Sequence, residues 1–439
     1  MNVLNRNINN LFFIFALVHL IIWTLIPSIT NKNLPLDTIE ALAWGSNLDW
    51  GFNKHPPVSA FFSEVFFNIF GAQDWAYYLL SQIFVIISFF YVFKLANEIF
   101  QNIKLSLVSV LLLESIFFYN FTTPEFNVNV CQLPFWSLVV YYSWKIYDAK
   151  EIRFFDCFLI SFFAAIGFLS KYLFIYLLIS IIFLFVFAIL VKNKKFDFKY
   201  IIIIETFLIL LVPHFIWLYD NEFITVTYGL KRTGLESFDF FNHIKFPIIF
   251  LLKQVGIIIP FLFLTWLLVK KVKFRINLKD KKLIFLIFIN ILPFFLIFIT
   301  SVIMGTKIRT MWMTPFYLFF GIFFVFIFHS QINLKRLKPF LYGFLFLFFF
   351  SPITYTYISI TENNKRTDYP GKEIATKVQI TWNENFDKEI EFVTGDEWKA
   401  GNLSYHLNDR PKWEGPNNND ILEKSSQFIC IGDICLGRY

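Results

Sequence analysis

Long apolar runs separated by short polar segments follow one another along the chain up to about residue 360. An apolar run of about 17–25 residues is long enough to cross a bilayer as a helix, and a helix pairs its own backbone polar groups, as lipid requires. Eleven runs of the 439-residue chain are candidates for such spans. They cover approximately residues 11–28, 75–93, 104–119, 127–144, 155–170, 172–191, 200–219, 247–269, 283–301, 313–330 and 339–359.

The composition agrees with a chain that lies mostly in lipid. Hydrophobic residues make up 57% of it, charged residues 16%, and the mean hydropathy is +0.58. Soluble domains are roughly 45–50% apolar and about 25% charged, so an ordinary cytosolic enzyme and a disordered chain are both excluded. The net charge of +7 does not indicate a nucleic-acid partner, because the Lys and Arg residues lie between the apolar runs. We therefore predict an all-α polytopic membrane protein with about eleven transmembrane helices.

The distribution of basic residues predicts the orientation. Arg6 and the loops near residues 94–104, 145–153, 192–199, 270–282 and 335–338 carry most of the Lys and Arg, and such loops face the cytoplasm. The first run follows Arg6 as a secretory signal would, but Ile26-Pro27-Ser28-Ile29 is no small-x-small cleavage site. We read it as a retained anchor with a cytoplasmic N-terminus, which after eleven spans leaves the C-terminus outside.

The residues after about 360 have a different composition. The segment 361–439 is rich in Asn, Asp, Glu and Lys, and contains strand-like runs at Glu389–Thr394 and Gln427–Ile431. We predict a transmembrane domain over 1–360 and a small extracytoplasmic α/β or mainly β domain over 361–439. Cys430 and Cys435 would lie in an oxidising compartment, where they either pair across a short loop or remain free thiols.

The first external loop, residues 29–74, carries the most informative polar residues. Asp37 and Glu40 are three residues apart, so a helix would place both carboxylates on one face. Lys54 and His55 follow and are fixed by Pro56-Pro57. A carboxylate that takes a proton from an acceptor, next to cations that stabilise a departing phosphate, is the chemistry of sugar transfer from a lipid phosphate. The bland alternative is that Asp37 caps a helix and Lys54 meets lipid headgroups.

Other external loops add candidates of the same kinds. Lys171 and Tyr172 join two spans, where Lys171 either binds a phosphate or snorkels as an ordinary lysine. His214 is more often a satisfied interfacial histidine than a ligand. The predicted phosphate-binding residues are Lys54, His55, Lys171, Tyr172, Lys231, Arg232, Lys307 and Arg309. The candidates for substrate contact are Glu125, Asn127, His214 and Trp312.

Several signatures are missing from the sequence. It has no Walker A loop for an ATP-driven pump and no zinc-type spacing on the external face. The intramembrane residues Glu114, Glu205 and Lys253 form no obvious chain across the bilayer. The external loops also have too few grouped carboxylates for a Mg²⁺ site, so we expect no metal and no other cofactor.

Taken together, these motifs resemble the bacterial glycosyltransferases of the protein-mannosyltransferase-like family 39, which includes the lipid A aminoarabinose transferases. The resemblance spans nearly the whole chain. It rests on Asp37-x-x-Glu40-x(3)-Trp44-Gly45, Lys54-His55-Pro56-Pro57, Ser170-Lys171-Tyr172, Lys307-x-Arg309-x-x-Trp312, Arg366–Gly371 and Gly395–Asn402. It implies the polytopic GT-C fold.

The resemblance also implies an activity. The donor would be an undecaprenyl-phosphate sugar, and the acceptor lipid A of lipopolysaccharide or another envelope glycan on the periplasmic face of the bacterial inner membrane. Asp37 matches the acidic catalytic residue, with Thr38 where many relatives have Glu, so the second acidic role goes to Glu40. Aminoarabinose transferases have Glu-Lys where this chain has Lys54-His55, which leaves the sugar open. The alternatives are a secondary transporter or lipid flippase, for which Glu114 or Glu205 would be essential, and an O-antigen ligase-like transferase.

Overall fold

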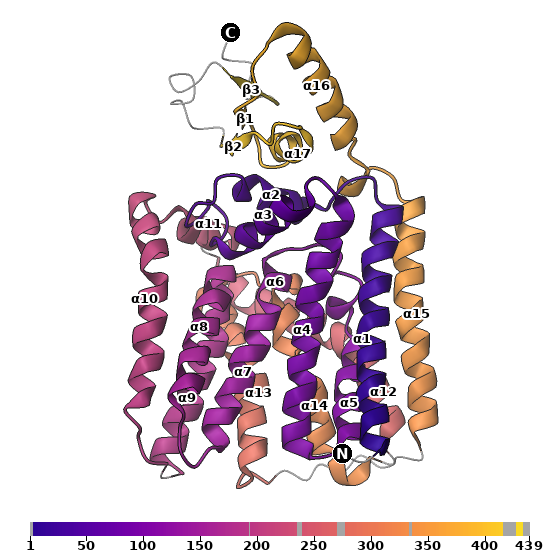
Figure 1. Ribbon diagram of the computed structural model, residues 1–439. Helices are drawn as coiled ribbons and strands as arrows, with labels where there is room; N and C mark the ends of the chain where they lie inside the picture. The colour runs from indigo at the N-terminus through magenta and orange to yellow at the C-terminus, as the bar shows by residue number, and fades with distance from the viewer. Residues whose placement is uncertain are drawn as a thin grey trace.

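The computed structural model describes residues 3–192, 194–234, 239–269, 277–332, 336–415 and 427–432, with only the backbone of residues 3–6. Cys435 and parts of the predicted basic loops at 270–282 and 335–338 lie outside these ranges. An upright bundle of helices carries a layer of shorter helices at one end, and a small domain with a sheet lies on that layer (Figure 1).

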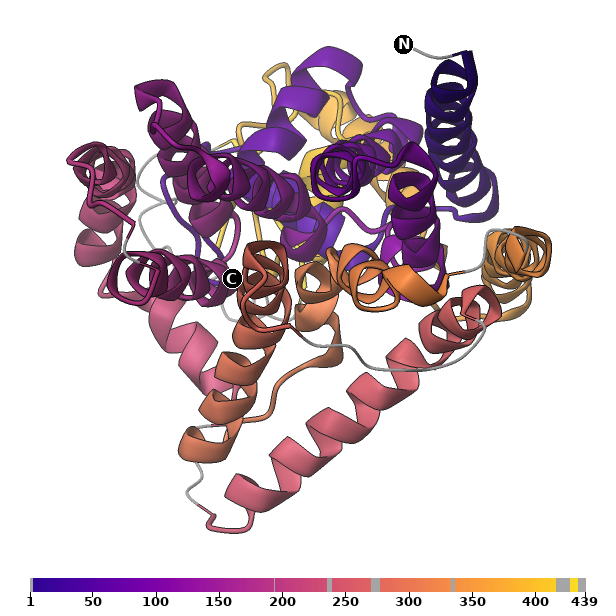
Figure 2. The same cartoon turned by 90° about the horizontal axis from the view of Figure 1, so that it is seen from below.

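The bundle contains most of the helices. In chain order these are α1 (Val3–Thr30), α4 (Asp74–Phe100), α5 (Ile103–Leu111), η1 (Leu112–Ser115), η2 (Phe117–Tyr119), α6 (Val128–Cys131), α7 (Leu133–Asp148), α8 (Phe154–Ser170), η3 (Tyr172–Phe174), α9 (Ile175–Leu190), α10 (Lys199–Asp220), α12 (Asn242–Leu268), α13 (Lys281–Met304), η4 (Thr310–Tyr317), α14 (Phe320–Ile327), η5 (His329–Gln331) and α15 (Leu337–Thr361). Aromatic rings fill much of the interior, as in the stacked pair Phe12 and Phe93 with ring centroids 4.4 Å apart. Seen from below, α12 runs obliquely along the outside of the bundle between α13 and α15 (Figure 2).

Within the described part of the chain, seven helices are long and apolar enough to cross a membrane. They are Asn7–Thr30, α4, Tyr172–Leu190, α10, α12, α13 and α15. The helices η4 and α14, which meet at 55°, make an eighth if they are counted as one bent span. The prediction of a helical membrane protein is supported, but eleven uninterrupted spans are not found.

The remaining predicted spans are short or broken, for local reasons. The run 104–119 stops being α-helical after Leu111, where Asn120 Nδ2 donates to the Glu114 carbonyl at 2.7 Å. The run 127–144 is divided into α6 and α7 at Gln132, and Pro134, which has no N–H, stands at the start of α7. The run 155–170 corresponds to α8, a helix of 17 residues. A single polar contact or proline can break a helix while it changes the mean hydropathy of the run very little. These breaks were therefore not predicted from the sequence.

The described parts of the predicted basic loops lie at the end of the bundle that holds the N-terminus (Figure 1). Lys194 donates to the carbonyls of Ile146 and Tyr147, and Lys281 pairs with Asp148. Lys282 Nζ donates to the Ile99 carbonyl at 2.6 Å. These contacts bring loops from four parts of the chain together, on the side opposite the sheet-bearing domain.

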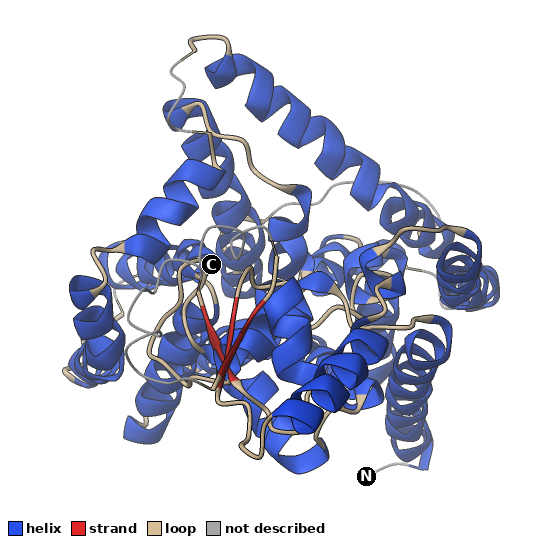
Figure 3. Ribbon diagram, turned by 90° about the horizontal axis from the view of Figure 1, so that it is seen from above, coloured by secondary structure: helices blue, strands red, loops and turns tan. Residues whose placement is uncertain are grey.

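The other end is covered by α2 (Leu36–Gly45), α3 (Val58–Phe70) and α11 (Ile224–Arg232). The C-terminal segment, which we call the tail, lies on α2 and α3 (Figure 1). It contains η7 (Arg366–Asp368), α16 (Gly371–Asn385), β1 (Phe392–Thr394), α17 (Lys399–His406), β2 (Lys412–Glu414) and β3 (Phe428–Cys430). The three strands are parallel, in the order β2-β1-β3, with Val393 opposite Trp413 and Ile429. Figure 3 shows this sheet above the helices, and it agrees with the α/β domain predicted for the tail.

Candidate functional site

A cavity of about 560 Å³ lies where the end of the bundle meets α2 and α11. Nine of the residues predicted for the site line it: Asp37, Glu40, Lys54, His55, Lys171, Tyr172, Arg232, Arg309 and Trp312. Apolar residues form much of the remaining wall, among them Leu173, Ile175, Leu230, Met304 and Met311. The cavity therefore combines a charged region with an apolar wall that continues onto the bundle helices α9 and α13.

Helix α2 begins in a way that brings two carboxyl groups together. Pro35 precedes it and offers no side-chain cap, so the first amide groups of the helix need another acceptor. Glu125 supplies it, because its Oε1 accepts from the Asp37 backbone N–H at 3.0 Å. Asn127 caps α6 through the amides of Asn129 and Val130. Glu125 and Asn127 thus lie behind the cavity wall rather than in it, at the base of the helix that carries Asp37.

The surroundings of Glu125 and Asp37 give the two carboxyl groups different protonation states. Burial and then the charge of Asp37 raise the pKa of Glu125 to about 8, so it holds a proton at neutral pH. Burial also raises the pKa of Asp37, but the charges of Lys171, Lys54, Arg232 and Arg309 oppose this. Because Asp37, unlike Glu125, lines the cavity with these four cations, we assign the proton to Glu125 and the negative charge to Asp37.

Lys54 lies between two carboxylates. Its Nζ is 2.8 Å from Glu40 Oε1 and 3.3 Å from Glu397 Oε1. Burial disfavours its ammonium, but the hydrogen bond to Glu40 and both carboxylate charges outweigh this and raise the pKa of Lys54. Burial raises the pKa of Glu40, with Lys54 acting against it. Lys54 is thus a permanent cation at the cavity wall.

The neighbouring His55 differs from Lys54. Burial and then the charges of Lys171 and Lys54 lower the pKa of His55 to about 3. It is therefore neutral at physiological pH and can donate or accept a hydrogen bond, but it adds no charge for binding a phosphate.

Lys171 is the most enclosed cation of the site, with 6% of its surface exposed. Its ammonium donates to Asn129 Oδ1 and lies 5.3 Å from the ring centroid of Trp312. Burial lowers the pKa of Lys171 to about 7, partly offset by Asp37. Burial, and then the charge of Arg232, likewise lower the pKa of Arg309. Keeping Lys171 and Arg309 charged in this buried region therefore costs free energy, and an anionic ligand would offset that cost.

Helix α11 forms the outer wall. Thr225 Oγ1 donates to the Phe52 carbonyl at 2.5 Å, which ties the helix to the first loop. One turn apart, Tyr228 and Arg232 face the cavity together, and Arg232 Nη1 donates to the Tyr228 hydroxyl at 2.7 Å.

The remaining predicted residues lie outside the cavity wall. His214 uses both ring nitrogens, one with the Tyr172 hydroxyl at 2.7 Å and one with the Trp50 carbonyl at 2.6 Å. This is the arrangement of a satisfied interfacial histidine. Lys231 and Lys307 are exposed and do not line the cavity.

The sequence analysis gave no role to Asn129, Thr225, Tyr228 or Glu397, although Glu397 lies in the run Gly395–Asn402. Tyr228 could have been found from its spacing of four residues from Arg232, since both then share a helix face. Nothing local indicates that Glu397 reaches Lys54. Within the described ranges, no group of three or more His, Cys, Asp or Glu residues is arranged to hold a metal ion, and the absence of a metal requirement stays a prediction.

Comparison with known protein families shows a similarity over part of the chain. The family model described as dolichyl-phosphate-mannose-protein mannosyltransferase matches residues 54–217. The matched region contains Lys54 and Lys171, begins after Asp37 and ends before Arg232. No curated protein matches the chain in sequence. The family match and the apolar helices together support a multi-pass membrane glycosyltransferase of the GT-C type that takes its sugar from a lipid-linked donor.

Proposed function

We propose that this protein is an inverting glycosyltransferase that moves a sugar from undecaprenyl phosphate to lipid A or another envelope glycan. The observation that carries the proposal is the composition of the cavity. Two acidic residues, Asp37 and Glu40, line it together with a group of cations, and much of the remaining wall is apolar and continues onto membrane helices.

Asp37 acts as the general base. It takes the proton from an acceptor hydroxyl, or orients an acceptor phosphate that is already ionised. The acceptor oxygen forms a bond to the anomeric carbon as the bond from that carbon to the donor phosphate breaks, and the phosphate leaves with the electron pair. A single displacement of this kind inverts the anomeric configuration. Glu40 supports the reaction indirectly, because its carboxylate holds Lys54.

The cations receive the phosphate. Lys54, Lys171 and Arg309 stand along the same wall as Asp37 and stabilise the charge that grows on the leaving group. Arg309 and Arg232 can each give two parallel hydrogen bonds to a phosphate. Since the protein supplies these charges, and phosphate is an adequate leaving group, the reaction needs neither a nucleotide nor a metal.

The apolar wall suits the lipid part of the donor. Leu173, Ile175 and Tyr176 come from the start of one membrane helix, and Thr300 and Met304 from the end of another. A polyprenyl chain along this wall would leave the cavity towards the bilayer, where its burial is favourable.

The proposal includes a location. The N-terminus would lie in the cytoplasm of a bacterial cell, which the distribution of basic loops supports, and the cavity is at the other end of the bundle. Residues 1–360 then form the transmembrane domain in the inner membrane, with its catalytic loop at 29–74, and residues 361–439 form a periplasmic domain.

Mass spectrometry of lipid A and other envelope glycans tests this function. Cells lacking the protein are complemented with the wild type, with Asp37→Asn, or with Asp49→Asn, which changes an exposed carboxylate of the same loop. We expect a sugar-sized mass that is restored by the wild type and by Asp49→Asn but not by Asp37→Asn. Full restoration by Asp37→Asn, or no change in any glycan, would overturn the proposal, and the second result would favour the transporter alternative.

A further inference from the structure

The tail shares its hydrophobic core with the first loop. Ala43, Trp44 and Phe52 of the loop pack in one cluster with Val393, Leu403 and Trp413 of the tail. Helices α17 and α2 meet at Gly401, where an added Cβ would lie 3.1 Å from both Ala43 Cβ and Ile39 Cγ2. The tail is therefore packed directly against the helix that carries Asp37 and Glu40.

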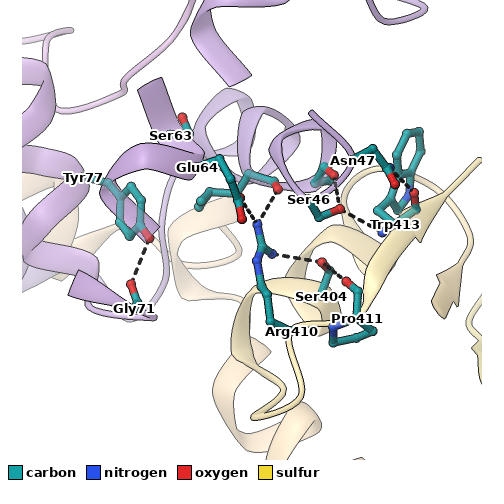
Figure 4. A network of polar contacts seen from close by, with 12 residues as sticks. Ser46, Asn47, Ser63, Glu64, Gly71, Tyr77, Ser404, Arg410, Pro411 and Trp413 are labelled. Atoms are coloured by element: carbon teal, nitrogen blue, oxygen red, sulfur yellow. Dashed lines mark hydrogen bonds and ion pairs between the residues drawn. The ribbon is translucent and has the colours of Figure 1, made fainter. Parts of the chain in front are cut away.

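Polar contacts at the C-terminal end of α2 fix this arrangement (Figure 4). Arg410 Nη2 donates to the Leu42 carbonyl at 2.8 Å and lies 2.6 Å from Glu64 Oε2. Ser46 Oγ accepts from the Trp413 backbone N–H at 2.9 Å. The rotation and position of α2 thus depend on residues of the tail.

The tail also reaches the cavity wall itself. Glu397 Oε1 accepts from Asn53 Nδ2 at 2.9 Å and lies 3.3 Å from Lys54 Nζ. Lys54, Glu40 and Glu397 are all mostly buried, with side chains 19%, 11% and 15% exposed. An ammonium between two largely desolvated carboxylates has little freedom to change its rotamer, so its remaining N–H faces a fixed direction.

We propose that Glu397 is a positioning residue of the transferase site, through which the tail holds Lys54 against the cavity wall for binding the donor phosphate. Glu397 does not line the cavity, so it acts through Lys54 and not on the substrate. Glu40 alone gives one contact to Lys54, and one contact leaves the long side chain free to pivot. The second carboxylate removes that freedom and keeps the cation ready before the donor arrives. The role in donor binding rests on the proposed function, whereas the fixing of Lys54 does not.

The chemical reactivity of Lys54 tests the fixing without any substrate. The full chain in lipid nanodiscs is treated with an amine-reactive succinimidyl ester, and the labelled fraction of Lys54 is measured by mass spectrometry relative to the exposed Lys377. We expect Glu397→Gln to raise Lys54 labelling at least threefold, because loss of the Glu397 charge lowers the pKa of Lys54 and loss of the contact frees its side chain. Glu397→Asp should give an intermediate value. Glu384→Gln, at an exposed position on α16, should match the wild type.

Donor kinetics test the consequence. In Glu397→Gln the KM for the polyprenyl-phosphate sugar should rise about fivefold. The kcat should fall by a smaller factor, because Asp37 is unchanged but Lys54 also stabilises the leaving phosphate. Amide hydrogen exchange of α17 monitors whether the tail stays docked. Wild-type labelling of Lys54 in Glu397→Gln would overturn the inference, and so would altered labelling with an unchanged KM. Altered labelling in a protein that transfers no sugar would instead refute the proposed function and leave the fixing of Lys54 standing.

Discussion

Replacement of Arg410 by Met gives the sharpest test of how the tail is attached. Arg410 is 15% exposed and its partner Glu64 is 10% exposed. The guanidinium also donates to the Leu42 carbonyl and the Ser404 hydroxyl, and it lies 4.1 Å from the ring centroid of Phe67. Met preserves most of the apolar stem but removes every one of these polar contacts.

The free-energy cost of the substitution comes mainly from Glu64, which stays buried without its partner. Removing one partner of a buried ion pair costs roughly 3–5 kcal/mol, because the other charge stays buried without a counter-charge. Water reaches both side chains to a small extent, so we take the lower end, about 3 kcal/mol. At about 1.4 kcal/mol for each factor of ten, the equilibrium between docked and undocked tail shifts by about a hundredfold.

Native-state hydrogen exchange of the peptide Lys399–His406 measures this shift, because its amides become accessible when α17 leaves α2. We expect exchange about a hundredfold faster in Arg410→Met, and recovery of most of the protection when Glu64→Gln removes the stranded charge. Arg366→Met is the matched control, since Arg366 is exposed and lies 5.1 Å from the Trp398 ring centroid, a contact of about 0.5–1 kcal/mol. Equal protection in Arg410→Met and Arg366→Met would refute the assignment of docking energy to this ion pair.

Three further substitutions address the cavity and the bundle. Because the pKa of Lys171 is about 7, its ammonium loses its proton as the pH rises, and kcat/KM should fall above pH 7. Lys171→Arg should move this fall to higher pH, and an unchanged pH profile would contradict a role of Lys171 in binding phosphate. Since Glu125, with a pKa of about 8, is protonated at pH 7, Glu125→Gln should keep the transfer rate within about threefold, whereas Asp37→Asn should lower it by roughly 10²–10⁴. Glu114→Gln weakens the buried contact of 2.5 Å with His19, so it should lower the thermal midpoint of unfolding. The transfer rate in nanodiscs should not change, and loss of function in the folded variant would favour transport.

The apolar segments can be identified directly from the sequence, but whether each forms one continuous helix is harder to predict. Hydropathy averages over a run and therefore marks 104–119 and 127–144 in the same way as the continuous helices. Whether a helix continues depends on single contacts, such as the one from Asn120 to the Glu114 carbonyl, which join residues only after the fold has formed. The apolar runs can still be followed along the chain, and their alternation is the basis for assigning each loop to one side or the other.

The site shows the same division. Asp37, Lys54 and Lys171 could be proposed from the sequence because successive external loops must return to one end of a helical bundle. His55 looked like a cation by its residue type, but its burial next to Lys171 and Lys54 makes it neutral. The contact between Glu397 and Lys54 depends on docking of the tail, which cannot be predicted from periodicity or residue spacing.

The distribution of ionisable groups favours transfer over transport. A transporter needs ionisable or hydrated positions that succeed one another through the bilayer. Of the intramembrane residues considered for that role, Glu205 and Lys253 are exposed on the outer surfaces of α10 and α12. Glu114 is buried, but its contacts are with His19 and Asn120, and Asn120 in turn accepts from Ser351 Oγ at 3.0 Å. That network connects the broken helix to α1 and α15, whereas the charges at the cavity face a space large enough for a ligand. Charges concentrated at one rim suit a reaction between two lipid-anchored molecules, because both substrates carry their reacting groups at the membrane surface and neither has to cross.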